Sequence, residues 1–166
     1  MPDQSALLDD ISDMLLGNPL LSSLPATEIK SAARYFSISE FAKDEVIFEE
    51  GDIGNFFCII IEGTISVQKA NQDGESVEMA KLPKGRTIGE MAVLDGERRS
   101  ATCIAATDCT LLLLSKDALE RMMLDAPRTA AKVIRAIAIS LSRRLRMVDG
   151  QMVDSPMFNS EIDFQI

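Results

Sequence analysis

Seven short segments between residues 36 and 114 are apolar or alternate apolar with polar residues, and this run constrains the fold more than any other feature. Several of them are separated by short glycine-containing stretches. These stretches suit turns, because Gly and Asn tolerate positive φ. Strands at such close spacing favour an antiparallel sandwich or barrel over parallel βαβ units. The segments are SISEFA, EVIF, FFCIIIE, TISVQK, VEMAKL, ATCIAA and CTLLLL, and the turns are EGD (50–52), EG (62–63), NQDG (71–74) and PKG (83–85).

Helices are expected on both sides of this strand-rich region. Residues 7–16 place their apolar side chains on one stripe that ends before a Gly-Asn-Pro stop, and residues 26–35 repeat apolar side chains at helical intervals. After the last strand, Ser115 is suited to cap a helix over 116–124. A long helix then begins near Pro127, a residue favoured in the first helical turn, and runs to about residue 148.

The length of 166 residues suits one domain with a single core and short flanking pieces. We expect an N-terminal helical segment (1–35), a strand-rich body (36–114), C-terminal helices (115–149) and a flexible tail (150–166). The tail shows no periodicity from residue 154 onward and is expected to be mobile. The alternative is that it docks on a partner through Met157, Phe158, Ile162 and Phe164.

The chain contains no histidine, which removes the commonest metal ligand and the commonest general base together. Its cysteines, Cys58, Cys103 and Cys109, lack CxxC spacing and lie in apolar runs, where reduced thiols pack as small hydrophobic groups. We therefore expect neither enzymatic activity nor a metal site. No segment approaches the roughly 20 apolar residues needed to cross a bilayer, and the N-terminus lacks a signal-peptide pattern, so a cytoplasmic protein without a membrane partner is expected.

Charge is distributed unevenly along the sequence. The whole chain carries −9, yet residues 128–147 hold six Arg and Lys and no acid, which leaves −15 for the remainder. The acidic balance argues against nonspecific nucleic-acid binding, while the basic face could meet an acidic partner or the acidic body itself. The same helix has a narrow apolar seam that could cover the β-domain or support a homodimer. The seam consists of Ile134, Ile137, Leu141, Leu145 and Val148.

Residues 89–102, GEMAVLDGERRSAT, carry the chemistry of the chain. Their first glycine permits a close approach to a ligand and precedes one or two helical turns that end at Gly96. The free N–H groups at the start of this short helix favour an anion. Arg99 returns on the next strand, where its planar guanidinium can form two parallel hydrogen bonds with a phosphate, and Ser100 adds a hydroxyl. Glu90 can accept a hydrogen bond from a sugar hydroxyl. Together these groups predict a ribose-phosphate site.

This run resembles the phosphate-binding cassette of cyclic-nucleotide-binding domains of the catabolite activator protein and protein kinase A regulatory subunit type. Residues 45–67, EVIFEEGDIGNFFCIIIEGTISV, are similar to the first hairpins of that family, in which glycines at the positions of Gly51 and Gly63 shape the roll. The resemblance covers about residues 20–148. It implies an α+β, mainly β fold: an antiparallel jelly-roll-like β-roll with N-terminal helices, a short phosphate-cassette helix and a C-terminal helical lid.

The resemblance also implies a role for each matching residue. Arg99 would bind the cyclic phosphate, and Glu90 would accept from the ribose 2′-hydroxyl. The sequence departs from the family pattern at Arg98, where proline is common, and at Thr87-Ile88, where an aromatic residue often precedes the glycine; Arg98 is interpreted as a solvated neighbour rather than a second phosphate ligand. The other implied binding residues are Gly89, Met91 and Ala92, through backbone or close packing, and Ser100 and Ala101, on the phosphate side.

Each assignment has a simpler interpretation when it is taken alone. Arg99 could be a surface arginine paired with Glu97 or Asp95, and Glu90 could be a first-turn acid favoured by the helix dipole. The Gly-Glu pair, the ten-residue return to Arg-Ser-Ala-Thr and the upstream glycine hairpins together favour the binding site.

The expected function is that of a cyclic-nucleotide sensor, for cAMP rather than cGMP, that needs no cofactor and relays binding through helix 128–148 to a protein partner or a second copy. DNA binding is not expected, because residues 150–166 are too few for a helix-turn-helix. The alternatives are a family member that senses another ligand or acts as a structural interaction module, and the effector domain of a truncated transcription regulator. A metal-dependent jelly-roll enzyme is disfavoured by the absence of histidine.

Overall fold

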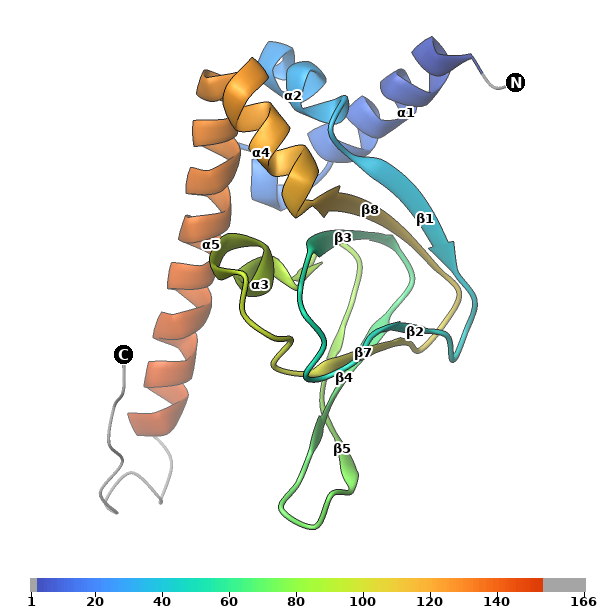
Figure 1. Cartoon of the computed structure of the whole chain (residues 1–166), viewed down its shortest axis with the longest axis vertical. Coiled ribbons are helices and arrows are strands. Elements are labelled where there is room, and N and C mark those ends of the chain that lie inside the picture. The colour runs from blue at the N-terminus through green and yellow to red at the C-terminus, as the bar shows by residue number, and fades with distance from the viewer. Residues whose placement is uncertain (1–2, 154–166) are drawn as a thin grey trace.

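The chain folds into two four-stranded antiparallel sheets that close into a roll, flanked by helices (Figure 1). The computed structural model describes residues 3–153, with side chains up to residue 150. This is the α+β, mainly β roll that the sequence predicts. In order across each sheet, the strands are β1 (Ser37–Phe41), β8 (Cys109–Ser115), β3 (Phe56–Glu62) and β6 (Thr87–Ile88), and β2 (Val46–Phe48), β7 (Thr102–Ala105), β4 (Ile65–Ala70) and β5 (Ser76–Leu82).

The helices gather at one end of the roll and along one side of it. Figure 1 shows α1, α2, α4 and the start of α5 together at the top, while α5 continues downward past α3 and the β4–β5 hairpin projects from the opposite end. The Ser115 hydroxyl accepts from the N–H of Ala118 at 3.0 Å, as expected for the cap of α4. The helical elements are α1 (Gln4–Leu16), the 3-10 turn η1 (Pro19–Leu21), α2 (Ala26–Ala33), α3 (Glu90–Asp95), α4 (Lys116–Asp125) and α5 (Pro127–Val153).

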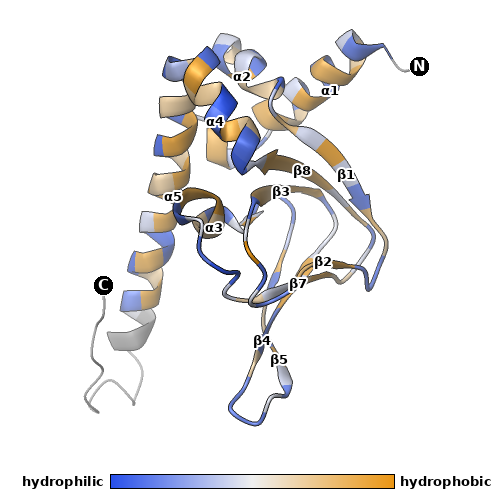
Figure 2. Ribbon diagram, in the orientation of Figure 1, coloured by the Kyte–Doolittle hydropathy of each residue, from blue (hydrophilic) through white to orange (hydrophobic). Residues whose placement is uncertain are grey.

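Strands β3 and β8 lie between two hydrophobic cores, which explains why their sequences are almost continuously apolar. One side of each strand, including Phe57 and Leu112, packs beneath the helices. The other side, including Cys58 and Leu111, faces the interior of the roll, where all three cysteines are buried and reduced. Figure 2 shows this hydrophobic centre on β3, β8 and α3, in contrast to the hydrophilic tip of the β4–β5 hairpin.

The ends of three helices differ by two or more residues from the sequence-based expectation, and one short strand was not expected. Helix α1 begins at Gln4, three residues early. Helix α2 ends at Ala33, two residues early, because Phe36 turns inward and packs edge-on against Phe57. Helix α5 extends to Val153 rather than residue 148, so residues 150–153 are helical and not part of a tail; one exposed glycine costs a helix only about 1 kcal/mol. Strand β6 was not predicted, because two residues show no periodicity. The expected mobility or docking of the tail concerns residues 154–166, which lie outside the described part.

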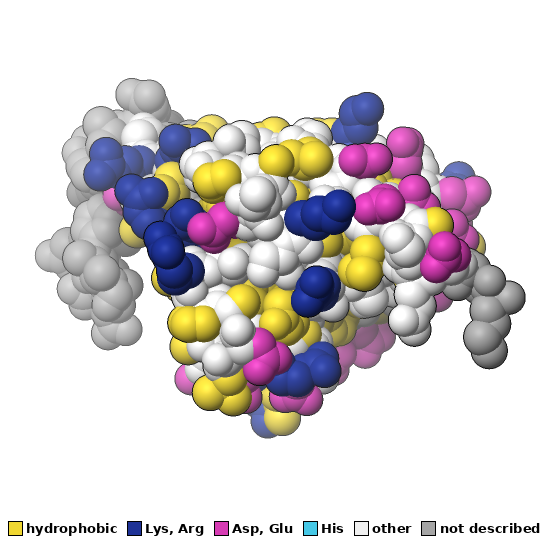
Figure 3. All heavy atoms as spheres, turned by 90° about the horizontal axis from the view of Figure 1, so that it is seen from above, with side chains coloured by type: hydrophobic (Ala, Val, Ile, Leu, Met, Phe, Trp, Pro, Cys, Tyr) yellow, Lys and Arg dark blue, Asp and Glu magenta, His cyan; other side chains and the backbone are white. Residues whose placement is uncertain are grey.

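The basic helix does sit beside an acidic body. In Figure 3, Lys and Arg side chains gather on the α5 side of the molecule, and Asp and Glu side chains gather on the opposite side. Two cations of α5 reach acids of the body: Lys132 pairs with Glu28, and Arg144 pairs with Glu90. Within residues 3–153, no helix combines the length and hydrophobicity that a membrane crossing requires.

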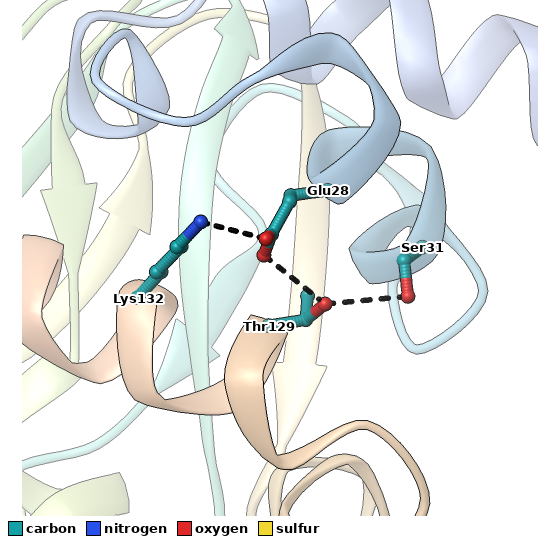
Figure 4. Close-up of polar contacts among 4 residues, drawn as sticks. All are labelled: Glu28, Ser31, Thr129 and Lys132. Carbon is teal, nitrogen blue, oxygen red and sulfur yellow. Dashed lines mark hydrogen bonds and ion pairs between the residues drawn. The ribbon is translucent and has the colours of Figure 1, made fainter.

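The start of α5 is joined to α2 by a small polar network (Figure 4). The ammonium of Lys132 donates to Glu28 Oε1 at 2.6 Å, and the hydroxyl of Thr129 lies 3.4 Å from both Glu28 Oε2 and Ser31 Oγ. The hydrogen bond from Lys132 lowers the pKa of Glu28, although partial burial opposes it. Because the buried Ile137 follows on the same helix, this network helps to fix the position from which α5 crosses the roll.

Substituting Glu28→Gln should destabilise the protein at pH 7 and have less effect in acid. A carboxylate whose pKa is lowered by folding stabilises the folded state above its ordinary pKa, and this contribution is lost as the pH falls through the lowered value. Urea unfolding should therefore show a gap between parent and variant at pH 7 that closes in acid, as the pH falls through the lowered pKa of Glu28. The exposed Glu120 on α4 provides the control substitution Glu120→Gln, which should produce no such gap. An equal gap at pH 7 and in acid would contradict the ionic role of Glu28.

Candidate functional site

A cleft of about 890 Å³ lies between the roll and α5, and it is the place where all seven predicted binding residues meet. One wall is formed by α3 and the segment that returns into β7. The other wall is the second half of α5, and the floor includes Phe48 and Cys103. The predicted residues that line the cleft are Gly89, Glu90, Met91, Ala92, Arg99, Ser100 and Ala101.

Helix α3 is kept short by a glycine at each end. Gly89 precedes it with φ of 78° and Gly96 follows it with φ of 73°. Residues other than glycine rarely adopt this left-handed backbone conformation. At Gly89 there is a second restriction, because an added Cβ would overlap Nη1 of Arg99. The glycine that opens the cassette is therefore required by the position of the arginine ten residues later.

Arg99 is the most constrained cation of the site. It is only 4% exposed, and its Nη1 and Nη2 donate to the carbonyls of Gly89 at 3.1 Å and Phe56 at 2.6 Å. Its Cζ lies 4.0 Å from the ring centroid of Phe48 and 4.7 Å from that of Phe56, so two aromatic rings hold the guanidinium plane. Its Nε is buried without a hydrogen-bond partner among the described residues.

No acid forms an ion pair with Arg99 in the described part of the chain. It forms no ion pair with Glu97 or Asp95, so the simpler interpretation as a paired surface arginine is wrong. Burial raises the pKa of the Cys103 thiol to about 12 and raises the pKa of Cys58 still further above its usual range, so both neighbouring thiols stay neutral near pH 7. Burial also lowers the pKa of Arg99 itself, which shows that its charged form is poorly solvated.

Glu90 is equally buried, with 2% exposure, so it is not a solvated first-turn acid. Its Oε1 accepts a hydrogen bond from the hydroxyl of Thr87 at 3.1 Å and forms an ion pair with Nη2 of Arg144 at 2.7 Å. Arg144 comes from α5, whereas Thr87 lies in β6 directly before the cassette. The acceptor of the site is thus tied to the helix that forms the opposite wall of the cleft.

Of the remaining predicted residues, Ala92 is buried on α3, and the other three lie on the rim. Ser100 and Met91 are exposed, and Ala101 is half-buried, all at the edge of the cleft. Arg98 is exposed and donates to the carbonyl of Gly51 at 2.8 Å, away from the aromatic pair that holds Arg99. Arg98 thus helps to join the cassette to the turn before β3.

Several residues of the site had not been identified from the sequence. Gly54 lies against the guanidinium, and a Cβ there would overlap the Cβ of Ala92. Its place in GDIGNFF, two residues before a strand, was the available signal, because a glycine there suggests a close backbone approach. The aromatic pair Phe48 and Phe56, and the partner Arg144, lie 43 or more residues from the groups they contact and carry no local signal.

Comparison with known proteins agrees with this geometry. The family described as "Cyclic nucleotide-binding domain" matches residues 38–126. The cyclic AMP receptor protein of Thermus thermophilus is 30% identical over 133 residues, 80% of this chain and 60% of that protein. A cAMP-dependent protein kinase regulatory subunit of Mycosarcoma maydis is 30% identical over 149 residues, 90% of this chain and 27% of that protein. A cyclic nucleotide-binding domain from Methylobacillus flagellatus KT has the same fold, with a TM-score of 0.78 at 24% identity over 96% of this chain and 86% of that chain.

The chain belongs to the cyclic nucleotide-binding domain family. It spans less than two thirds of either curated relative, so the shared part is the binding domain and not the full length of those proteins.

The contact between Gly54 and α3 generates a direct test of the packing. Gly54→Ala should destabilise the protein by about 1–3 kcal/mol, because the new methyl group overlaps Ala92 and crowds the Arg99 guanidinium. Adding Ala92→Gly should recover part of this loss, although glycine in a helix costs about 1 kcal/mol of its own. Urea unfolding of the parent, the two single variants Gly54→Ala and Ala92→Gly, and the double variant measures these differences in stability. If Gly54→Ala were as stable as the parent, the close approach would not exist.

Proposed function

We propose that the chain is a non-catalytic sensor that binds a 3′,5′-cyclic nucleotide beside Arg99, with cAMP preferred to cGMP, and relays binding through α5. The observation that carries the proposal is the buried guanidinium of Arg99, which has aromatic and carbonyl contacts but no anionic partner in the described part of the chain. Burying an uncompensated charge is unfavourable, so an anionic ligand at this point would gain a charge-assisted interaction. The absence of histidine supports a binding rather than a catalytic role.

In this proposal the ligand is held by two groups of opposite charge. The cyclic phosphate would meet Arg99, with the hydroxyl of Ser100 and the backbone of the cassette beside it. The ribose 2′-hydroxyl would donate to Glu90, which is a carboxylate with more acceptor sites than its two present partners use.

The preference for cAMP rests on weaker support than the phosphate site. Both 30%-identical relatives described above carry cyclic AMP in their names. On α5, the residues that face the cleft beyond the phosphate site are mainly apolar or small, including Ile139, Ser140 and Met147, which suits a flat base. Titration with cAMP and cGMP in parallel measures the preference, and tighter binding of cGMP would overturn it.

Arg144 offers a route from the ligand to α5. Its ion pair with Glu90 connects the proposed sugar acceptor to the distal half of the helix. A ligand that forms a hydrogen bond with Glu90 would therefore change the strength or geometry of this ion pair. The distal half of α5 also carries exposed apolar residues. Leu145 and Val148 are 59% and 44% exposed, although they belong to the same apolar seam of α5 as the buried Ile137. We propose that a second copy or another protein covers them; sedimentation of the protein with and without nucleotide would reveal a dimer and show whether ligand changes it.

Arg99→Ala should weaken cyclic-nucleotide binding by at least about tenfold, because a hydrogen-bonded charged group contributes roughly 1.5–3 kcal/mol. The neighbouring substitution Arg98→Ala is a matched control, since Arg98 is exposed and its change should cost about fivefold or less. Calorimetric titration with cAMP and cGMP measures both. Parent-like affinity in Arg99→Ala would refute the proposed phosphate site.

Arg144→Gln should separate the relay from binding. With the Glu90 ion pair removed, we expect nucleotide to bind within about fivefold of the parent, since the Arg144 side chain is half exposed. Hydrogen exchange in residues 141–150 should respond to nucleotide in the parent and respond less in the variant. Arg146→Gln, on the exposed side of the same turn, should respond like the parent. An undiminished response in Arg144→Gln would exclude this ion pair from the relay.

A further inference from the structure

The cleft continues beyond the cassette into a region that the proposed ribose-phosphate contacts leave unused. Its volume of about 890 Å³ is near the upper end of the roughly 300–1,000 Å³ found for ligand pockets. The continuation is bounded by the turn between β5 and β6, by η1 and the two serines after it, and by the middle of α5. Three cations line it, Lys84 and Arg86 from the turn and Arg135 from α5, and we call these three residues the outer subsite.

The backbone that carries the outer subsite is well anchored. The N–H of Gly85 donates to the carbonyl of Ile60 at 2.7 Å, and the N–H of Ile60 donates to the carbonyl of Arg86 at 2.9 Å. The amide of Asn18, next to η1, reaches the carbonyl of Gly85 at 3.4 Å. The turn therefore starts from a fixed position on β3 and contacts the N-terminal helical region, which limits where its cations can reach.

The charge of the cleft exceeds what one cyclic phosphate neutralises. Among the described residues, seven Lys and Arg side chains line the cleft against three carboxylates, a surplus of four in a chain whose net charge is −9. Arg98, Arg99 and Arg144 have protein partners. The three residues of the outer subsite are exposed, and their side chains form no hydrogen bond or ion pair within the part of the chain that has been described. Such a wall concentrates positive potential where the cleft opens.

The outer subsite adjoins the sugar side of the proposed nucleotide site. Arg86 directly precedes Thr87, whose hydroxyl donates to Glu90, the proposed acceptor for the ribose. Arg86, Thr87 and Glu90 line the same cleft, so we expect a group that extends from the sugar away from Arg99 to come near the outer subsite.

We propose that the outer subsite binds a second phosphoryl group, so that the cleft holds two phosphoryl groups, one at Arg99 and one at Lys84, Arg86 and Arg135. This inference rests on the proposed function for the first of them. The second can be part of the same ligand, as in a cyclic dinucleotide, or a free phosphate that binds beside a cyclic mononucleotide. Lysine and arginine at a cleft mouth suit either, because both bind phosphate oxygens through charge-assisted hydrogen bonds.

The test is a set of calorimetric titrations of the full chain with cAMP alone, with cAMP in excess inorganic phosphate, and with the cyclic dinucleotide of adenosine. In the parent, we expect the second phosphoryl group to tighten binding by at least about tenfold in one of the two latter arms, and the arm identifies its source. The variant Lys84→Gln/Arg135→Gln should lose this gain while binding cAMP alone within about threefold of the parent. Both positions are exposed, so circular dichroism should show an unchanged fold.

A second double variant controls for the general repulsion between an anion and a protein made more acidic by the loss of two cations. Lys43→Gln/Arg121→Gln removes the same charge from exposed positions outside the cleft and should keep the gain. The inference is overturned if neither arm tightens binding in the parent, or if the gain survives in Lys84→Gln/Arg135→Gln. Those results leave cAMP binding intact and spare the proposed function, whereas failure of both cAMP and cGMP to bind the parent would end both proposals.

Discussion

Arg99 lies buried between the rings of Phe48 and Phe56, and its terminal nitrogens are held by main-chain carbonyls rather than by an acid. Much of the surrounding backbone is shaped to permit this. An added Cβ at Gly89 would overlap the guanidinium, and Gly54 lies against its other edge. The turn before β3 is joined to the returning cassette by two main-chain hydrogen bonds: the N–H of Arg99 donates to the carbonyl of Asp52 at 2.7 Å, and the N–H of Gly51 donates to the carbonyl of Arg99 at 2.9 Å. A positive charge is thus fixed in a poorly solvated position with little freedom to reorganise, which is the condition under which an anion binds with a small entropic cost.

Helix α5 connects the cleft to the rest of the molecule. Its first half is part of the core beneath the helices, where Ile137 is buried, and Lys132 joins it to α2 through Glu28. Its second half forms a wall of the cleft and contacts the site through the ion pair of Arg144 with Glu90. The first half is anchored by packing, whereas the side chains of the distal half are mostly exposed, so under the proposed function the distal half is the part expected to respond to a ligand. The exposed apolar residues Leu145 and Val148 lie on this distal half, so a movement of the distal half would change the apolar surface that they form.

Local sequence patterns were sufficient to predict the helices, seven of the eight strands and the cassette, because each is encoded by residues close together in the chain. The glycines around α3 and the serine cap of α4 are examples in which a single residue type has one structural use. The pairing of Arg144 with Glu90, and of Arg99 with two phenylalanines, joins residues that are 43 to 54 positions apart and follows only from the way the roll and α5 pack. The extent of α5 was underestimated for a related reason: tertiary packing of its first half stabilises the helix beyond what its local sequence indicates.

We propose that the buried guanidinium of Arg99 is the anion-binding group of the cleft. A crystal structure of the protein with cAMP tests this most directly, because it locates the phosphate without relying on a substitution. We expect phosphate oxygens within hydrogen-bonding distance of Arg99 and the ribose 2′-hydroxyl within hydrogen-bonding distance of Glu90. A nucleotide bound elsewhere, or bound in the cleft with Arg99 contacting only the carbonyls of Gly89 and Phe56, would contradict it.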